Sequence, residues 1–344
     1  VRRRDRRVDM GRVRNAFLVL AATLALMPLT GPAGASNDPS FPTQWGMARI
    51  GAETAWTRTT GAGIRIGVVD TGVDLAHEDL VGRVVAHTSC VDSGGDPAKC
   101  EGSGQDVYGH GTHVAGISAA VRDNGVGVAG VAPDATLVVA RAFTETGSAN
   151  EEDVIAGIKW VVDQGAKVVN LSLGEALFVT AATLGSGLVE GIDYAWSHGA
   201  VPVVSSGNED LFGLGIGSNQ YGDLDALVVG ATGPDKQVAS YSSPTGNAKW
   251  ALVAPGGSGS SENDENVLST WWAEGKANQY EYLAGTSMAA PHVSGAVALL
   301  LAQGLSQQQA VDRILETADA GVVCGPNSPT CRGGLDVAAA TGAR

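Results

Sequence analysis

Residues 64–70 read Ile64-Arg65-Ile66-Gly67-Val68-Val69-Asp70, a nearly continuous apolar run that ends in an acidic residue. A run of this length is typical of a strand that is covered on both faces, as in a parallel sheet. Similar runs lie at residues 136–140, 168–172, 201–205, 227–230 and 251–254. The stretch at 64–70 therefore predicts one buried strand of a larger, mostly parallel sheet.

Helical patterns alternate with these runs, at residues 111–120, 150–164, 188–198, 287–303 and 306–318. Alternating strands and helices indicate an α/β fold, a doubly wound, mostly parallel central sheet flanked by helices. The pattern predicts one domain over residues 36–344. Sites in such sheets lie beyond the carboxyl ends of the strands. Asp70 ends the first strand and Asn208 follows the fourth, so both are candidate site residues.

The first 35 residues differ in composition from the rest. Arginines crowd residues 2–14, an apolar run follows at 16–29, and Ala33-Gly34-Ala35 gives a small-x-small pattern. This order predicts a secretory signal peptide over residues 1–35 and a secreted protein, whether translation starts at Val1 or at Met10. A membrane anchor is the alternative, but the apolar run is shorter than the ~20 residues that a span needs. No later stretch is long and apolar enough to span, which predicts no membrane association once the signal is removed.

The chain is acidic, with a formal net charge of −14. Without residues 1–35, which hold seven arginines and two aspartates, 15 basic and 34 acidic residues remain, a net charge of −19. Such a charge disfavours nucleic acids and anionic membrane surfaces as partners. Acidic loops are also able to hold Ca²⁺.

Four cysteines form two pairs that are close in sequence. In an exported protein, such spacing predicts the disulfides Cys90–Cys100 and Cys324–Cys331. A zinc site is the alternative, which the absence of a Cys-x-x-Cys pattern disfavours.

Three motifs carry candidate chemistry: Asp70-Thr71-Gly72, His110-Gly111-Thr112-His113, and Gly285-Thr286-Ser287-Met288-Ala289-Ala290-Pro291-His292. A serine hydroxyl becomes a nucleophile when an imidazole takes its proton and a carboxylate orients that imidazole. A serine in the first turn of a helix also has backbone N–H groups and a helix dipole that favour a developing oxyanion. The motifs therefore predict Ser287 as nucleophile, His110 as general base and Asp70 as orienting carboxylate.

Each motif alone has another interpretation. Asp-Thr-Gly also occurs in aspartic proteases and ordinary turns, His110 and His113 have a spacing that allows them to bind a metal together, and Gly-Thr-Ser also begins ordinary helices. In the order Asp, His, Ser, however, the three motifs resemble the subtilisin-like serine protease family. The resemblance extends from Gln44 to Leu335.

This resemblance implies a secreted serine endopeptidase that acts through an acyl-enzyme intermediate. It implies that His110 is catalytic, whereas His113 and His292 are structural. The segment Ser206-Gly207-Asn208 resembles the family's oxyanion segment, in which Asn208 would donate its side-chain amide. Two competing classes remain: a non-catalytic binding protein on the same scaffold, and an acid-active carboxyl-serine peptidase, which would need Glu in place of His110.

The substrate-binding residues are also implied by the resemblance. Ser172-Leu173-Gly174 resembles the strand that pairs with the substrate backbone and forms a wall of the specificity pocket, and Gly147 lies in the opposite strand. A polypeptide would bind between them in extended form, by β-augmentation. We expect broad specificity with a large apolar residue before the scissile bond, and a monomeric enzyme.

A structural Ca²⁺ is implied in the same way. Asp79 matches the family's calcium-binding carboxylate, the loop 122–127 resembles the other half of that site, and Gln44 would be a third contributor. The loop leaves open whether Asp123 or Asn124 is the ligand. A solvated acidic loop is the alternative.

One feature departs from the family pattern. Members usually carry a folding and inhibitory propeptide after the signal, but here Gln44-Trp45-Gly46 follows within ten residues of the expected cleavage site. The sequence therefore predicts no propeptide between residue 36 and the peptidase domain.

Overall fold

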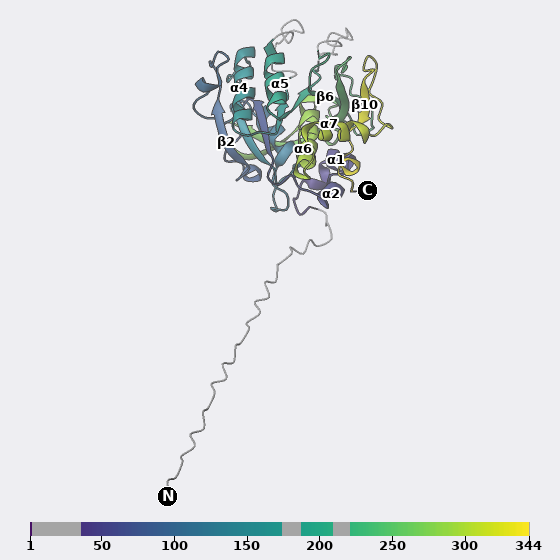
Figure 1. The fold of residues 1–344 in the computed structure, drawn as a ribbon. Coiled ribbons are helices and arrows are strands. Elements are labelled where there is room, and N and C mark those ends of the chain that lie inside the picture. Colours follow the sequence, from purple (N-terminus) through teal and green to yellow (C-terminus); the bar gives the residue numbers. More distant parts are fainter. Residues whose placement is uncertain (2–35, 174–186, 209–220, 344) are drawn as a thin grey trace. The chain divides into compact units, whose positions relative to one another are not determined.

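An eight-stranded sheet forms the centre of the computed structural model, which describes residues 1, 36–173, 187–208 and 221–343. Every pair of neighbouring strands in this sheet is parallel, and the order is β10-β7-β6-β5-β4-β1-β3-β2 (Figure 1). The strands are β1 (Arg65–Asp70), β2 (Val84–Ser89), β3 (Thr136–Arg141), β4 (Val168–Leu171), β5 (Val201–Ser205), β6 (Leu227–Thr232), β7 (Trp250–Pro255) and β10 (Cys331–Gly334). This confirms the predicted α/β fold. The predicted signal peptide lies outside the described residues, apart from Val1.

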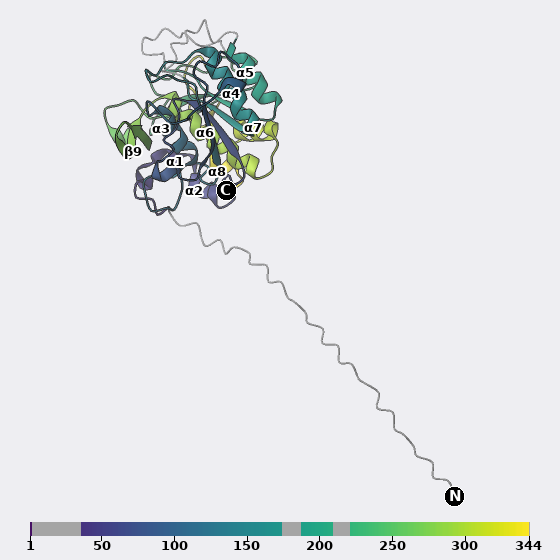
Figure 2. The ribbon, with the colours of Figure 1, turned by 90° about the vertical axis from the view of Figure 1, so that its left-hand side faces the viewer.

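Helices cover both faces of the sheet, which is why its inner strands are mostly apolar. In β1, Ile66 and Val68 join the core layer that also holds α3 (His110–Ala119) and α6 (Thr286–Ala302). Val69 points into the other layer, which includes α4 (Glu151–Asp163) and α5 (Gly187–Ser197). Figure 1 shows α4 and α5 side by side, and Figure 2 shows α3 and α4 on different sides of the strands.

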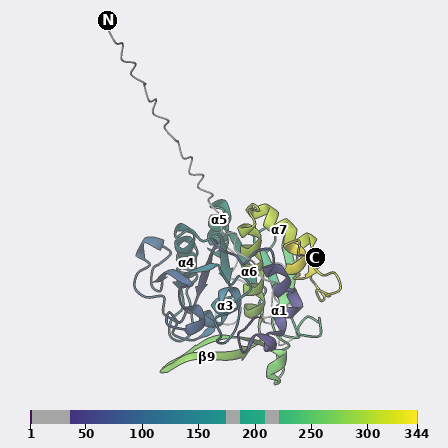
Figure 3. The same cartoon turned by 90° about the horizontal axis from the view of Figure 1, so that it is seen from below.

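Four further helices and a hairpin complete the fold. A separate antiparallel hairpin is formed by β8 (Val267–Ala273) and β9 (Lys276–Leu283), and it packs against α3 (Figure 3). Helix α7 (Gln307–Glu316) begins with a capping box in which Ser306 and Gln309 bond reciprocally. The other elements are α1 (Trp45–Ile50), α2 (Ala52–Trp56), α8 (Val337–Ala340) and the 3₁₀ turns η1 (Phe41–Thr43), η2 (Glu78–Leu80), η3 (Pro97–Lys99) and η5 (Asn263–Glu265). None of the helices in the described part is long and apolar enough to cross a bilayer.

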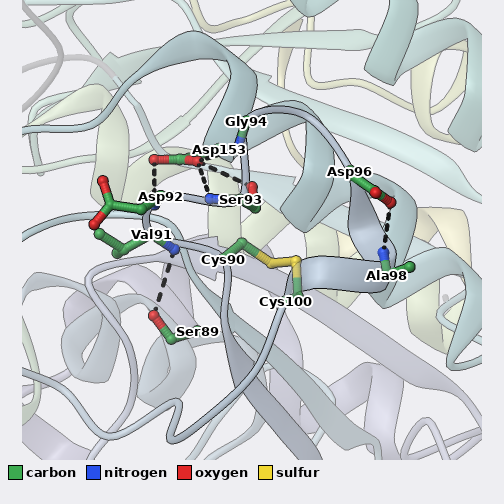
Figure 4. The surroundings of a disulfide bond; sticks show 10 residues. All are labelled: Ser89, Cys90, Val91, Asp92, Ser93, Gly94, Asp96, Ala98, Cys100 and Asp153. Carbon is green, nitrogen blue, oxygen red and sulfur yellow. Dashed lines mark hydrogen bonds between the residues drawn. A yellow bond between two sulfur atoms is a disulfide. The ribbon is translucent and has the colours of Figure 1, made fainter.

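Both predicted disulfides are present, Cys90–Cys100 and Cys324–Cys331, and no described cysteine is free, so the zinc alternative is set aside. The loop between Cys90 and Cys100 is also tied to the start of α4 (Figure 4). There the buried carboxylate of Asp153 accepts hydrogen bonds from the backbone N–H groups of Asp92, Ser93 and Gly94 and from the Ser93 hydroxyl. A covalent bond and a carboxylate thus hold the same loop.

Removing the first disulfide, with Cys90→Ala and Cys100→Ala together, should lower the free energy of unfolding. The bridge closes a loop with a sequence separation of 10 residues, and restricting such a loop in the unfolded chain stabilises a protein by about 3 kcal/mol. Urea unfolding followed by tryptophan fluorescence measures the change. Unfolding of the unaltered chain in a thiol reductant is the control, and an unchanged midpoint would contradict the prediction.

Candidate active site

The predicted site residues lie at one edge of the sheet, where neighbouring strands end. Strands β5, β4 and β1 are adjacent and parallel, so their carboxyl ends meet. Asp70 is the last residue of β1, Ser172 follows β4 directly, and Asn208 lies three residues beyond β5. The sheet therefore brings together segments that are far apart in the sequence.

Asp70 and His110 form a direct hydrogen bond. Nδ1 of His110 lies 2.8 Å from Oδ1 of Asp70, and the same oxygen accepts from the N–H of Thr71 at 2.7 Å. Because a carboxylate can only accept, Nδ1 is the donor, and this fixes the tautomer in which Nε2 of a neutral ring is available as a base. Asp70 is buried, with 1% of its surface exposed, so water competes little for this bond.

Glycine allows the two segments to approach each other this closely. Gly111 follows His110 in the first turn of α3, and a Cβ atom there would collide with the carbonyl oxygen of Gly72 and lie 3.1 Å from Asp70. A side chain at position 111 would therefore push α3 away from the end of β1.

Ser287 lies in the first turn of α6, tied to the end of β4 by two hydrogen bonds. Its hydroxyl donates to the carbonyl of Ser172 at 3.4 Å, and its own carbonyl accepts from the Ser172 hydroxyl at 2.8 Å. In a regular helix that carbonyl would accept from the N–H four residues later, but residue 291 is proline and has none. Pro291 thus leaves the Ser287 carbonyl available to Ser172.

Asn208 is oriented by the residue that precedes Ser287. Its Oδ1 accepts from both the N–H and the hydroxyl of Thr286, each at 2.9 Å, which leaves Nδ2 as the remaining donor. Nδ2 is buried and has no hydrogen-bond partner among the residues that the structure describes. A Cβ placed on Gly285 would lie 3.4 Å from Nδ2 and 3.7 Å from the N–H nitrogen of Ser287. Two donors therefore border the space that the glycine leaves open.

The other two histidines of these motifs are buried in the core. Nε2 of His113 donates to the carbonyl of Glu281 in the hairpin, and Nδ1 of His292 donates to the carbonyl of Met288 one turn earlier. Burial lowers the pKa of His113 to about 3 and that of His292 to about 4. Both are neutral at pH 7. Within the described ranges, no three His, Cys, Asp or Glu side chains gather where they could hold a metal ion.

The predicted substrate-binding residues are partly described. Ser172 contacts Ser287 as above, and Leu173 next to it is buried. Gly147 has a φ of 73°, and a Cβ there would lie 3.2 Å from the ring of Tyr108, an exposed residue that the sequence analysis did not single out. Gly174 lies outside the described residues.

Two of the residues predicted for calcium do meet. Oδ1 of Asp79 accepts from the Asn124 amide at 2.7 Å, and Oδ2 accepts from the N–H of Val128 at 2.8 Å. Burial raises the pKa of Asp79 because it disfavours the charged form. A second buried carboxylate, Asp38, was missed by the sequence analysis; it accepts from the N–H groups of residues 123–125 in the same loop.

Gln44 and Asp123 are engaged elsewhere. Both polar atoms of the Gln44 amide bond to the backbone of Ala129, at 3.0 and 2.8 Å. The exposed carboxylate of Asp123 accepts from Arg122 at 2.7 Å and from the N–H of Asn37 at 3.1 Å. Of the two alternatives in the loop, Asn124 is the one beside Asp79.

Comparisons with known proteins extend over most of the chain. Residues 61–334 match the model of the subtilase family. The chain is 38% identical to thermitase of Thermoactinomyces vulgaris, over 82% of this chain and 91% of that protein. It is 36% identical to subtilisin DY of Bacillus licheniformis, over 75% of this chain and 84% of the relative. A solved protease structure from Pseudoalteromonas arctica has a TM-score of 0.74 and 29% identity, with 90% of this chain and 99% of that chain covered.

The two buried histidines predict how stability depends on pH. Between about pH 6.5 and pH 4, the unfolded chain binds protons at His113 and His292 that the folded chain does not, so the free energy of unfolding should fall as pH falls. His292→Gln should remove nearly one of the protons taken up on unfolding, and so should reduce the slope of the free energy of unfolding against pH by about 1.4 kcal/mol per pH unit. Urea unfolding at several pH values measures it. His198→Gln, at an exposed position, is the control, and equal slopes in all three proteins would refute the prediction.

Proposed function

Given that the chain belongs to the subtilase family and is a serine endopeptidase, we propose that Ser287 is its nucleophile, with His110 as general base and Asp70 as orienting carboxylate. The observation that carries the proposal is the buried Nδ2 of Asn208, which has no partner among the described residues and borders the same open space at Gly285 as the N–H of Ser287. A buried donor without a partner is costly to a fold, and it is expected where a ligand or a transition state supplies the acceptor.

The first chemical step forms an acyl-enzyme. Oγ of Ser287 attacks the carbonyl carbon of the scissile peptide bond while Nε2 of His110 takes its proton. The hydroxyl's bond to the Ser172 carbonyl is long, at 3.4 Å, and is therefore easily exchanged for one to the imidazole. The carboxylate of Asp70 stabilises the imidazolium that results.

The carbonyl oxygen gains a negative charge as the tetrahedral intermediate forms. Nδ2 of Asn208 and the N–H of Ser287 donate to this oxygen, and the N-terminal end of α6 adds a favourable dipole. His110 then returns its proton to the leaving amine, and the C–N bond breaks. A water molecule, deprotonated by the same imidazole, hydrolyses the ester and restores the Ser287 hydroxyl.

Polypeptides are the substrates of an endopeptidase, and we propose that they bind in extended form between the segment after β4 and the segment that contains Gly147. Extended binding uses backbone hydrogen bonds and so favours exposed, unfolded segments of many sequences. We retain the preference for a large apolar residue before the scissile bond as an expectation from the sequence resemblance. The two disulfides and the composition of residues 1–35 support secretion, and we propose a monomer.

We further propose a structural Ca²⁺ at the loop 121–128. Asp38 and Asp79 are both buried beside this loop. Hydrogen bonds from residues 123–125, Asn124, Val128 and Tyr280 stabilise part of their charge, and a cation would stabilise it further. The carbonyl groups of residues 121, 126 and 128 accept no hydrogen bond from the described residues, and carbonyl and carboxylate oxygens are the ligands that Ca²⁺ prefers. Asp38, Asp79 and Asn124 with these carbonyls would hold the ion, which would stiffen the loop and take no part in catalysis.

Two substitutions test the proposed chemistry. Ser287→Ala should abolish both peptide hydrolysis and labelling by a fluorophosphonate, because no nucleophile remains. Asn208→Ala should lower kcat by about 10²–10³ with little change in KM, because its amide acts on the oxyanion and not on the bound substrate. Steady-state kinetics on a chromogenic peptide measures both parameters. Retained labelling in Ser287→Ala, or an unchanged kcat in Asn208→Ala, would count against the assignment.

Calcium binding is tested in the Ser287→Ala background, where self-digestion does not interfere. Ca²⁺ at 100 times its Kd should stabilise the folded protein by about 2.7 kcal/mol and raise Tm relative to a chelator. Asp79→Asn should remove this response, whereas Asp134→Asn, at an exposed acidic residue, should keep it. Differential scanning calorimetry measures Tm. The same Tm with calcium and with chelator would refute the site.

A further inference from the structure

Asp106 is a fully buried carboxylate just before helix α3, and it accepts five hydrogen bonds. Its Oδ1 accepts from the Thr71 hydroxyl at 2.8 Å and from the N–H groups of Tyr108 and Gly109 at 3.0 and 2.9 Å. Its Oδ2 accepts from the N–H of Thr112 at 2.9 Å and from the Thr112 hydroxyl. It forms no ion pair with a described residue, so these donors and the α3 dipole stabilise its charge.

Thr71 connects this carboxylate to both Asp70 and His110. A hydroxyl has one proton, and Thr71 gives it to Asp106, so a lone pair of the same oxygen accepts the N–H of Gly111 at 2.9 Å. Thr71 directly follows Asp70, and Gly111 directly follows His110. The backbone segments that carry the two side chains are therefore joined by one hydroxyl, and Asp106 determines its orientation.

Asp106 also fixes the turn that leads into the helix. Its bonds to Tyr108, Gly109 and Thr112 span the two residues before His110 and the third residue of α3. These N–H groups lie at a helix start, where they lack intrahelical acceptors. An asparagine at position 106 has the same shape, but its NH₂ group is a donor. It would replace one of the accepting oxygens and lose the hydrogen bonds on that side.

We propose that Asp106 is a positioning residue, which holds the end of β1 and the start of α3 at the separation that the Asp70–His110 hydrogen bond requires. The proposal rests on the catalytic roles given to Asp70 and His110 above. Asp106 contacts neither side chain directly; it acts through Thr71 and through the backbone around His110. Small errors in the position of a general base slow proton transfer and leave substrate binding largely intact.

The matched control is Asp153, the carboxylate drawn in Figure 4. It is 2% exposed, against 0% for Asp106, and it accepts four hydrogen bonds at the start of another helix, α4. Its partners lie in the Cys90–Cys100 loop and include none of the residues proposed for catalysis. Asp153→Asn therefore measures what the loss of a buried, hydrogen-bonded carboxylate does to stability alone.

The experiment compares Asp106→Asn, Asp153→Asn, Thr71→Val and Thr71→Ser by kcat and KM, with Tm measured in the Ser287→Ala background. We expect Asp106→Asn and Thr71→Val to lower kcat by about 10- to 100-fold with nearly unchanged KM. Thr71→Ser keeps the hydroxyl and should keep kcat within about twofold of the unaltered enzyme. Asp153→Asn should lower Tm and retain kcat.

Two results would overturn the proposal: a kcat in Thr71→Val equal to that in Thr71→Ser, or the same fall in kcat in Asp106→Asn and Asp153→Asn. If Asp106→Asn does not fold, the comparison of Thr71→Val with Thr71→Ser tests the proposal, because both of these variants keep the Asp106 carboxylate. Failure of the catalytic assignment is a separate result, since it would appear as hydrolysis by Ser287→Ala whatever happens at Asp106.

Discussion

Helix α6 passes through the centre of the core, and its burial constrains the rest of the molecule. All residues from Thr286 to Leu300 are buried, with β4 to β7 on one side and α3 on another. Small side chains make this possible: at Gly295, a Cβ would lie 2.5 Å from the Cβ of Val131. A helix enclosed in this way cannot slide or rotate without disturbing both neighbours. Ser287 therefore has a fixed place relative to the ends of β4 and β5.

The same enclosure explains which parts of the fold were predictable. The six predicted strands and five predicted helices are all present, with no end shifted by more than two residues. The strands and α6 are buried and so have nearly continuous apolar sequences, whereas α4 and α7 each bury an apolar face. The strands that were missed lack this signal. Strand β2 alternates between half-buried and exposed residues before two buried ones, β10 reads Cys-Arg-Gly-Gly, and β8 and β9 form a partly exposed hairpin. Their pairing depends on the finished sheet and on α3 more than on their own composition.

The candidate site divides in a similar way. Asp70, His110 and Ser287 stand in motifs whose residue types indicate their chemistry, and Asn208 stands in a recognisable segment. Asp38 and Asp106 were not predicted, because their importance comes from hydrogen bonds to segments that only the fold brings near. The effect of Pro291, which leaves the Ser287 carbonyl available as an acceptor, was also not predicted. It depends on the Ser172 hydroxyl, which lies more than a hundred residues away in the sequence. The sequence thus indicated the candidate reacting groups better than the groups that we propose hold them in place.

The position of α6 late in the chain also determines the stage of folding at which the proposed active site is complete. The helix follows β1 to β7 in sequence, yet it packs against β1 and β4 to β7 at once. The nucleophile is therefore the last of the proposed catalytic residues to leave the ribosome, and it has no defined position until a largely complete sheet receives its helix. Such long-range contacts form slowly. The site that we propose is consequently complete only after α6 has packed against these strands.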